Sequence, residues 1–159
     1  KKGYNYQKLG DEELPEKVAD LIADQKVIGW FQGRMEFGPR ALGGRTIIGD
    51  SRSSETQRTI NLKIKYRESF RPFAPSVLEE HAHEIFDMPV RKSQFMQFTA
   101  PCKFPKKYPA ICHVDNTSRV QTVSKEDNPD FFEGKTLKEN KKIPFETVVD
   151  EEVLRCEWV

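Results

Sequence analysis

The sequence centres on residues 33–78, GRMEFGPRALGGRTIIGDSRSSETQRTINLKIKYRESFRPFAPSVL. This stretch opens with a turn rich in glycine and arginine, continues through a β-branched run and a predicted helix over residues 54–64, and ends on a second basic cluster. Between residues 33 and 73 there are nine Lys and Arg against four Asp and Glu, whereas the whole chain carries a net charge of only +1. Positive charge concentrated beside flexible glycines indicates a site for phosphate or another anion.

Length and composition favour one soluble domain with a hydrophobic core, since the chain has 159 residues of which 32% are charged. No apolar run approaches the roughly 18–20 residues that span a bilayer, and no signal-peptide pattern precedes the body. The three cysteines, Cys102, Cys112 and Cys156, lack the CxxC spacing of disulfide-rich or zinc-binding chains. We therefore expect a protein of the reducing cytoplasm that has no membrane partner.

The N-terminal part predicts a helix followed by a strand. Residues 1–10 have the character of a polar leader, and residues 11–25 that of a helix capped by Asp11. Residues 27–32 then form an apolar run that ends at Gly33. A helix that leads into a buried strand and then into a glycine- and arginine-rich turn is typical of a binding loop in an α/β fold.

The turn after this strand contains two candidate anion-binding residues, Arg40 and Arg45. Their guanidinium groups offer planar, forked donors to phosphate or carboxylate. The glycine spacing matches neither the P-loop nor the dinucleotide-binding fingerprint. The alternative is that these arginines belong to an ordinary solvated surface, and charge alone does not separate the two interpretations.

The second basic cluster consists of Lys65, Arg67 and Arg71. If this segment is extended, the three side chains share one face, because side chains of a strand alternate with period two. Neighbouring cations repel one another without an anion between them, and Glu68 can neutralise one of them but not all three. The cluster therefore predicts an anion-binding face.

The rest of the chain predicts further α/β elements and no metal site. Residues 79–86 resemble a short helix and residues 94–100 a half-buried strand. His113 and Asp115 have the spacing of metal ligands on a strand, but two ligands are too few for a metal site. We interpret Asp115-Asn116 as a turn between two strands.

Three blocks then resemble a known family: FGPRALGGRTIIGDSR (37–52), INLKIKYRESFRPFAPSVL (60–78) and HVDNTSRVQTVSKEDNP (113–129). In this order they resemble the C-terminal domain of the nodulation- and antibiotic-type O-carbamoyltransferases, over about residues 29–129. The resemblance implies a YrdC-like fold of the α/β (α+β) class, in which a twisted mixed sheet with flanking helices carries a concave cationic pocket.

The resemblance also implies an activity. Domains of this kind bind ATP, with Mg²⁺ carried by the nucleotide, together with carbamoyl phosphate, and form carbamoyl adenylate with loss of pyrophosphate. A separate N-terminal domain, TsaD-like and with an iron-type metal site, then transfers the carbamoyl group to a hydroxyl acceptor in a biosynthetic process. This sequence lacks that domain, so we expect it as a partner within a longer protein, and we expect no tightly bound metal in this chain.

The resemblance assigns roles to particular residues. It implies Lys65 and Arg71 as catalytic residues, with Lys65-Tyr66-Arg67 as the Lys-x-Arg element of YrdC-like pockets. The residues implied to bind nucleotide and carbamoyl phosphate are Arg40, Lys65, Arg67, Arg71, Met96 and Arg119.

The chain divides into a leader (1–10), a carbamoyltransferase C-terminal domain (11–134) and a divergent tail (135–159). From Ser124 to Val159 there are ten Asp and Glu against six Lys and Arg, the reverse of the central stretch. Alternation of apolar residues over 143–149 predicts a strand that completes the sheet. The alternative is that the acidic tail lies over the cationic pocket.

Two other functions remain open, namely a YrdC-like module that binds RNA or nucleotide without catalysis, and a catalytically silent interaction domain. Tyr66, Phe70 and Phe73 stand in apolar contexts, which predicts core positions and not platforms for stacking bases. This disfavours nucleic acid as the partner.

Overall fold

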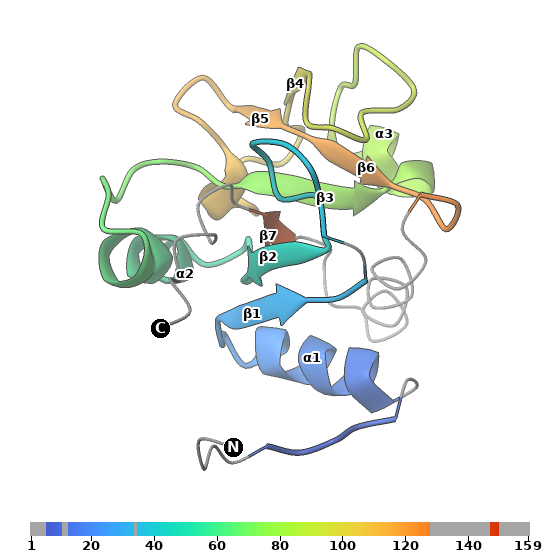
Figure 1. Ribbon diagram of the computed structural model, residues 1–159. Helices are drawn as coiled ribbons and strands as arrows, with labels where there is room; N and C mark the ends of the chain where they lie inside the picture. The colour runs from blue at the N-terminus through green and yellow to red at the C-terminus, as the bar shows by residue number, and fades with distance from the viewer. Residues whose placement is uncertain (1–5, 11–12, 34, 128–146, 150–159) are drawn as a thin grey trace.

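The computed structural model describes residues 6–10, 13–33, 35–127 and 147–149 (Figure 1). The elements follow the order α1 (Glu13–Ala23), β1 (Ile28–Phe31), β2 (Arg45–Ile48), α2 (Ser54–Thr59), η1 (Ile60–Ile64), β3 (Ala74–Leu78), η2 (Glu79–His81), α3 (Ala82–Ile85), β4 (Thr99–Pro101), η3 (Pro109–Ile111), β5 (Thr117–Arg119), β6 (Gln121–Val123) and β7 (Thr147–Val149). Of the short η elements, η1 is a π-helix and the other two are 3₁₀ turns. The predicted mixture of helices and strands is confirmed.

Helix α1 forms where the sequence predicts it. Glu13 and Glu16 stand in its first turn, where the N-terminal end of the helix dipole favours acidic side chains. Pro15 stands there too, at a position where its missing N–H interrupts no helical hydrogen bond. Ile22 is buried in a cluster that includes residues of β1. The predicted cap, Asp11, lies outside the described residues.

Strands β1 and β2 pair antiparallel, with Ile28 opposite Ile48. The loop that joins them contains the glycine- and arginine-rich turn predicted from the sequence. Gly38 and Gly43 have φ angles of 126° and 109°, which L side chains rarely adopt. Glycine at these positions therefore lets the chain reverse between the two strands.

The largest sheet has the order β6-β3-β7. Strand β3 pairs parallel with β6, with Val77 opposite Thr122, and antiparallel with β7, with Ala74 opposite Val149. All five residues of β3 are buried, so its backbone groups need partners within the protein. A long crossover that carries α3, β4 and β5 leads from β3 to its parallel partner (Figure 1). The predicted mixed sheet is therefore present, beside two two-stranded antiparallel sheets.

Strand β7 belongs to the tail that the sequence separates from the main domain. It lies against the edge of β3 opposite to β6, so β3 has a neighbouring strand on each side. The other residues of the predicted tail strand, 143–146, and the segment 151–158 lie outside the described residues. The division into leader, domain and tail remains a prediction.

The strand predicted over residues 94–100 is wrong for most of its length. Strand β4 begins only at Thr99, and Met96 has a φ of 53° and is buried. Ser93, which comes just before this stretch, is bonded to the segment of β5 and β6. Its N–H donates to Thr122 Oγ1 at 2.8 Å, and its hydroxyl donates to the Val120 carbonyl at 2.7 Å. The Ser93 and Phe98 carbonyls also accept from the N–H groups of Thr122 and Val120, so separate bonds of several kinds take the place of a continuous strand ladder here.

The buried apolar side chains form two clusters. One surrounds β3 and α3 and includes Val77 and Phe86, whose side chains are fully buried. The other joins α1 and β1 to the end of the glycine-rich loop, and includes Ile22, Trp30 and Met96. In the described part of the chain, none of the helices has the length and apolar character that a membrane crossing requires.

A buried charged network ties the end of α1 to the start of α2. Asp50, whose side chain is 2% exposed, accepts hydrogen bonds from Arg52, and it accepts one from Gln25 Nε2 at 2.8 Å. Gln25 Oε1 in turn accepts from the hydroxyl of Thr56 in α2. Burial raises the pKa of the Asp50 carboxyl, but the hydrogen bonds and charge of Arg52 outweigh it and lower the pKa below 3.8.

The lowered pKa of Asp50 predicts a specific loss of stability in acid. Because the folded protein favours the carboxylate, its contribution is fully present above the usual pKa of 3.8 and is lost as the pH falls through the lower pKa of the folded state. We expect Asp50→Asn to lower the free energy of unfolding at pH 7 by about 1.5–3 kcal/mol. Urea unfolding from pH 7 to pH 2.5 measures both proteins, and the difference between them should shrink toward the acid end. An equal difference at every pH would contradict this account.

Removing β7 should destabilise the sheet. Deletion of residues 141–159 takes away a neighbour of β3 and exposes the backbone groups of a buried strand, which we expect to lower the melting temperature and to cause aggregation. Deletion of residues 150–159 alone is the matched control, because it leaves β7 in place. Thermal unfolding and size-exclusion chromatography measure the outcome. A monomeric 141–159 deletion that melts like the full chain and binds ATP more tightly would show that the tail covers the pocket.

Candidate functional site

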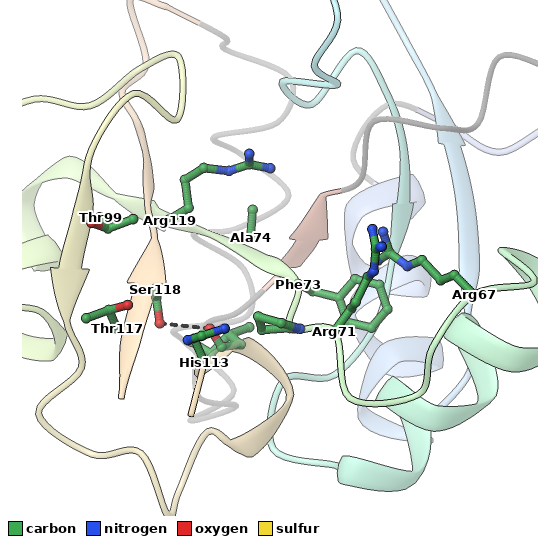
Figure 2. Close-up of a pocket in the computed structure, with 11 residues that line it drawn as sticks. Arg67, Arg71, Phe73, Ala74, Thr99, His113, Thr117, Ser118 and Arg119 are labelled. Atoms are coloured by element: carbon green, nitrogen blue, oxygen red, sulfur yellow. Dashed lines mark hydrogen bonds between the residues drawn. The ribbon is translucent and has the colours of Figure 1, made fainter. Parts of the chain in front are cut away.

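A cleft of about 460 Å³ opens beside the first residues of β3 (Figure 2). One wall comes from the segment between η1 and β3, and the other from the residues between η3 and the end of β5. The volume lies within the range of about 300–1,000 Å³ that is usual for small-molecule sites. The described residues that line the cleft are Arg67, Arg71, Pro72, Phe73, Ala74, Thr99, Ile111, His113, Thr117, Ser118 and Arg119.

Three arginines from two distant parts of the chain line this one cleft. Figure 2 shows Arg67 and Arg71 on one side and Arg119 on the other. His113 adds an imidazole, and no Asp or Glu is among the described residues of the lining. The arrangement favours an anionic ligand, because guanidinium groups match the oxygen geometry of phosphate and carboxylate.

The segment that carries Arg67 is not extended, so the predicted strand geometry of Lys65-Tyr66-Arg67 is wrong. The N–H of Lys65 donates to the Ile60 carbonyl at 2.9 Å, and the N–H of Arg67 to the Asn61 carbonyl at 3.0 Å. Tyr66 between them has a φ of 51°. These bonds satisfy carbonyl groups that the end of a helix leaves without partners, and they reverse the chain at this point.

The reversal separates residues that strand alternation would have placed together. Arg67 and Arg71 line the cleft, whereas Lys65 does not, and its Nζ is buried. Arg40 also lies outside the lining, with its Nη1 at 3.4 Å from the Phe95 carbonyl. Met96 is 1% exposed and packs in the core cluster beside α1 and β1. Of the six predicted binding residues, the structure therefore brings three to one cleft.

Arg67 and Arg71 are held by different partners. Arg67 Nε donates to Asn61 Oδ1 at 2.7 Å, and its guanidinium lies 5.3 Å from the centre of the Phe73 ring. Arg71 Nε lies 2.8 Å from Glu68 Oε2, in a pair whose two side chains are about half exposed. The pKa of the Glu68 carboxyl is lowered, first by a hydrogen bond from its own backbone N–H and then by the charge of Arg71. An exposed pair of this kind is weak, so an anion in the cleft can compete with Glu68 for Arg71.

The opposite wall is fixed by a turn at Asp115-Asn116, as predicted, although this turn follows the 3₁₀ turn η3 and not a strand. Asp115 Oδ1 accepts from the N–H of Thr117 at 2.9 Å and from its hydroxyl at 2.7 Å, and lies 3.3 Å from His113 Nδ1. These contacts lower the pKa of the Asp115 carboxyl, with the Thr117 hydroxyl as the largest cause. Asn116 has a φ of 63°, a conformation that asparagine tolerates well. The turn thereby holds His113 and Thr117 at the cleft.

Arg45, a candidate in the sequence, has a structural place instead. It is 7% exposed, with its Nη2 donating to the Gly38 carbonyl at 2.8 Å and its Nε at 3.4 Å from Glu36 Oε2. Glu36 also accepts from the N–H groups of Leu42 and Gly44. The carboxylate and the guanidinium together hold the glycine-rich loop, so Arg45 is committed to the fold and not to a ligand.

Several residues of the cleft were not singled out by sequence reasoning. From the sequence, His113 is considered only as a metal ligand and that role is rejected, and Thr99, Thr117 and Ser118 have no role. A signal was present in the third block, where HVDNTSR places a histidine, two hydroxyls and an arginine within seven residues. Asn61 was also missed, since nothing in the local pattern shows that its amide faces Arg67.

Within the described residues, no group of three or more His, Cys, Asp or Glu gathers that could hold a metal ion. The expectation that this chain binds no metal tightly remains a prediction.

Comparison with known proteins now identifies the family. The family model of the carbamoyltransferase C-terminus matches residues 19–145, which is most of the chain. The chain therefore belongs to the carbamoyltransferase C-terminus family, as the three sequence blocks predict.

The chain is similar to several curated proteins over most of its length. It is 48% identical to nodulation protein NolO of Bradyrhizobium diazoefficiens, over 77% of this chain and 23% of that protein. It is 47% identical to nodulation protein NolNO of Sinorhizobium fredii, over 77% of this chain and 18% of that protein. It is also 47% identical to the uncharacterized protein sll1178 of Synechocystis sp., over 80% of this chain and 24% of that protein. The chain thus spans a quarter or less of the length of these relatives.

If the cleft binds an anion, removing Arg119 should weaken that binding. Loss of one hydrogen bond from a charged donor is worth about 1.5–3 kcal/mol, so we expect Arg119→Ala to bind inorganic pyrophosphate about tenfold to a hundredfold less tightly. Calorimetric titration measures the affinity, and Lys65→Ala in the same titration tests whether Lys65 reaches the ligand.

Arg91→Ala is the matched control, because the Arg91 side chain is 87% exposed and lies outside the cleft. We expect this variant to keep the affinity of the unmodified chain. Equal losses of affinity in Arg91→Ala and Arg119→Ala would mean that pyrophosphate binding depends on the net charge of the chain and not on the cleft.

Proposed function

We propose that this chain is the adenylate-forming domain of an O-carbamoyltransferase, which binds ATP and carbamoyl phosphate in the arginine-lined cleft. Carbamoyl phosphate first loses its phosphate to water. An oxygen of the resulting carbamate then attacks the α-phosphorus of ATP, the bond to the bridging oxygen breaks, and pyrophosphate leaves. The carbamoyl adenylate passes to a separate domain, where an acceptor hydroxyl attacks the carbamoyl carbon and AMP leaves.

The observation that carries this proposal is the convergence of Arg67, Arg71 and Arg119 on one cleft in a member of the carbamoyltransferase C-terminus family. Attack on the α-phosphorus increases the negative charge on the phosphoryl oxygens and on the departing pyrophosphate. Guanidinium groups already in place stabilise that charge without reorganisation at the moment of reaction. Family membership supports a reaction that transfers a carbamoyl group, and the arginines of the cleft support the binding of its phosphate-containing substrates.

In this proposal Arg67 and Arg119 bind phosphate oxygens, and Lys65 and Arg71 are the catalytic cations. Lys65, Arg40 and Met96 lie outside the cleft, so contacts between these three residues and the nucleotide require their segments to move when it binds. Arg71 needs no such movement, because it already lines the cleft beside Ala74, where β3 begins.

The proposal also names partners. Because the curated relatives are about four to six times longer than the region they share with this chain, we propose that a TsaD-like domain with an iron-type metal site completes the enzyme. Mg²⁺ enters with ATP as part of the substrate. We propose the cytoplasm as its location, and Cys102 and Cys112, which form no disulfide within the described residues, are consistent with a reducing compartment.

Isotope exchange between labelled pyrophosphate and ATP tests the adenylate step on this chain by itself. Because the step is reversible, we expect label to enter ATP only when carbamoyl phosphate is also present, and Arg71→Ala to slow the exchange by about a hundredfold or more. Arg91→Ala should exchange at the normal rate. Binding of ATP without any exchange, at all concentrations of carbamoyl phosphate, would refute the proposed reaction.

One observation favours a second function, the binding of single-stranded RNA. Tyr66 and Phe70 are 86% and 73% exposed, so their predicted core positions are wrong, although Phe73 is buried as predicted. Exposed aromatic side chains beside arginines are the usual means of binding single-stranded nucleic acid. A mobility shift with a labelled RNA at 50 and 200 mM salt tests this function, because binding through phosphates falls steeply with salt. Loss of the shift in Tyr66→Ala, together with absence of pyrophosphate exchange, would favour RNA over carbamoyl transfer.

A further inference from the structure

Asn61 is a buried polar residue directly beneath the loop that carries Arg67 and Arg71. It belongs to the π-helix η1, and it is 0% exposed. Short π-helical turns are rare and are found frequently at functional sites. A buried amide needs partners for its oxygen and for both of its N–H hydrogens, and all of these partners lie in the arginine loop.

The contacts of Asn61 determine the orientation of its amide. Oδ1 lies 2.7 Å from Arg67 Nε, which can only donate a hydrogen bond. Nδ2 lies 3.2 Å from the Ser69 carbonyl and 3.0 Å from the Arg71 carbonyl, which can only accept. No other orientation of the amide satisfies all three partners. A fourth contact runs through the backbone, where the Asn61 carbonyl accepts from the N–H of Arg67.

We propose that Asn61 is the positioning residue of the anion cleft, and that it holds the Arg67 guanidinium and the Arg71 backbone in the geometry that a phosphate group needs. This inference rests on the proposed function, since it concerns the same cleft. A long arginine side chain that is already held in place loses less conformational freedom when the ligand binds. The Arg71 carbonyl, which accepts from Asn61 Nδ2, also accepts from Gln57 Nε2 at 2.9 Å.

The neutrality of the amide matters to this role. A carboxylate in the place of Asn61 Oδ1 would also hold Arg67 Nε, but it would cancel the charge that the ligand needs. The chain shows this contrast at Arg45, which is buried against the Glu36 carboxylate and holds a loop together. A neutral amide thus holds Arg67, which lines the cleft, whereas a buried carboxylate holds Arg45, which serves the fold.

Binding of inorganic pyrophosphate to the full chain, measured by calorimetry, is the first part of the test. We expect Asn61→Ala to weaken binding about tenfold or more, the size of effect seen when residues that orient metal ligands are removed. We expect Asn61→Asp to weaken it at least as much, although aspartate has nearly the same shape, because the new charge opposes that of Arg67. Thermal unfolding shows in each case whether the variant is folded at the temperature of the titration.

A double-mutant cycle separates positioning from general support of the fold. If Asn61 acts through Arg67, the double variant Asn61→Ala, Arg67→Ala should lose less affinity than the product of the two single losses. The control cycle pairs Asn61→Ala with Arg119→Ala, whose residues belong to opposite walls, and there the losses should multiply. Multiplication in both cycles, or normal affinity in the folded Asn61 variants, would overturn the inference.

If the Asn61 variants do not fold, the Arg67 Nε–H signal in nitrogen-15 spectra of the unmodified chain tests the positioning role instead. A hydrogen-bonded Nε–H should exchange slowly with water and be visible without pyrophosphate, and comparison with Arg67→Lys assigns it. A signal that appears only with pyrophosphate would overturn the positioning role. If the unmodified chain does not bind pyrophosphate at all, the proposed function fails and the inference falls with it, whereas binding without coupling refutes the inference alone.

Discussion

Strand β3 is buried along its whole length, so its backbone groups must find their hydrogen bonds within the protein. Strands β6 and β7 supply these partners on its two edges. Because β6 runs parallel to β3, the chain has to return to the level at which β3 begins before β6 can form. That crossover carries the His113–Arg119 segment past the start of β3, and so one wall of the cleft is placed against the other.

Electrostatic repulsion sets the second constraint, since three guanidinium groups line a cleft whose described residues include no acid. The structure limits the electrostatic repulsion because the guanidinium groups have different partners. Arg67 is bound to a neutral amide and lies over the Phe73 ring, whereas Arg71 forms an exposed and therefore weak pair with Glu68. Neither arrangement places a buried carboxylate against these arginines.

Local sequence patterns predict the structure correctly where the interactions that stabilise a segment lie within that segment. Helix α1 and the turn at Asp115-Asn116 both depend on neighbours in sequence, and the structure has both of them. The resemblance of three blocks likewise identified the family, because those blocks are specific in order and in length. The sequence and the resemblance together predict Arg67, Arg71 and Arg119 as binding residues, and the structure brings all three to one cleft.

The sequence by itself determined the mixed α/β class, the family and the set of cationic residues from which a site can be built. Only the tertiary structure decided which cations share the cleft. Arg45 and Lys65 look as available as Arg71 in the sequence, but Arg45 is buried against Glu36, and the reversal at Tyr66 turns Lys65 away from the lining. The physical reason is that hydrogen bonds across a folded loop, and the capping of a helix end, direct these side chains. A pattern of residue types along the chain does not contain that information.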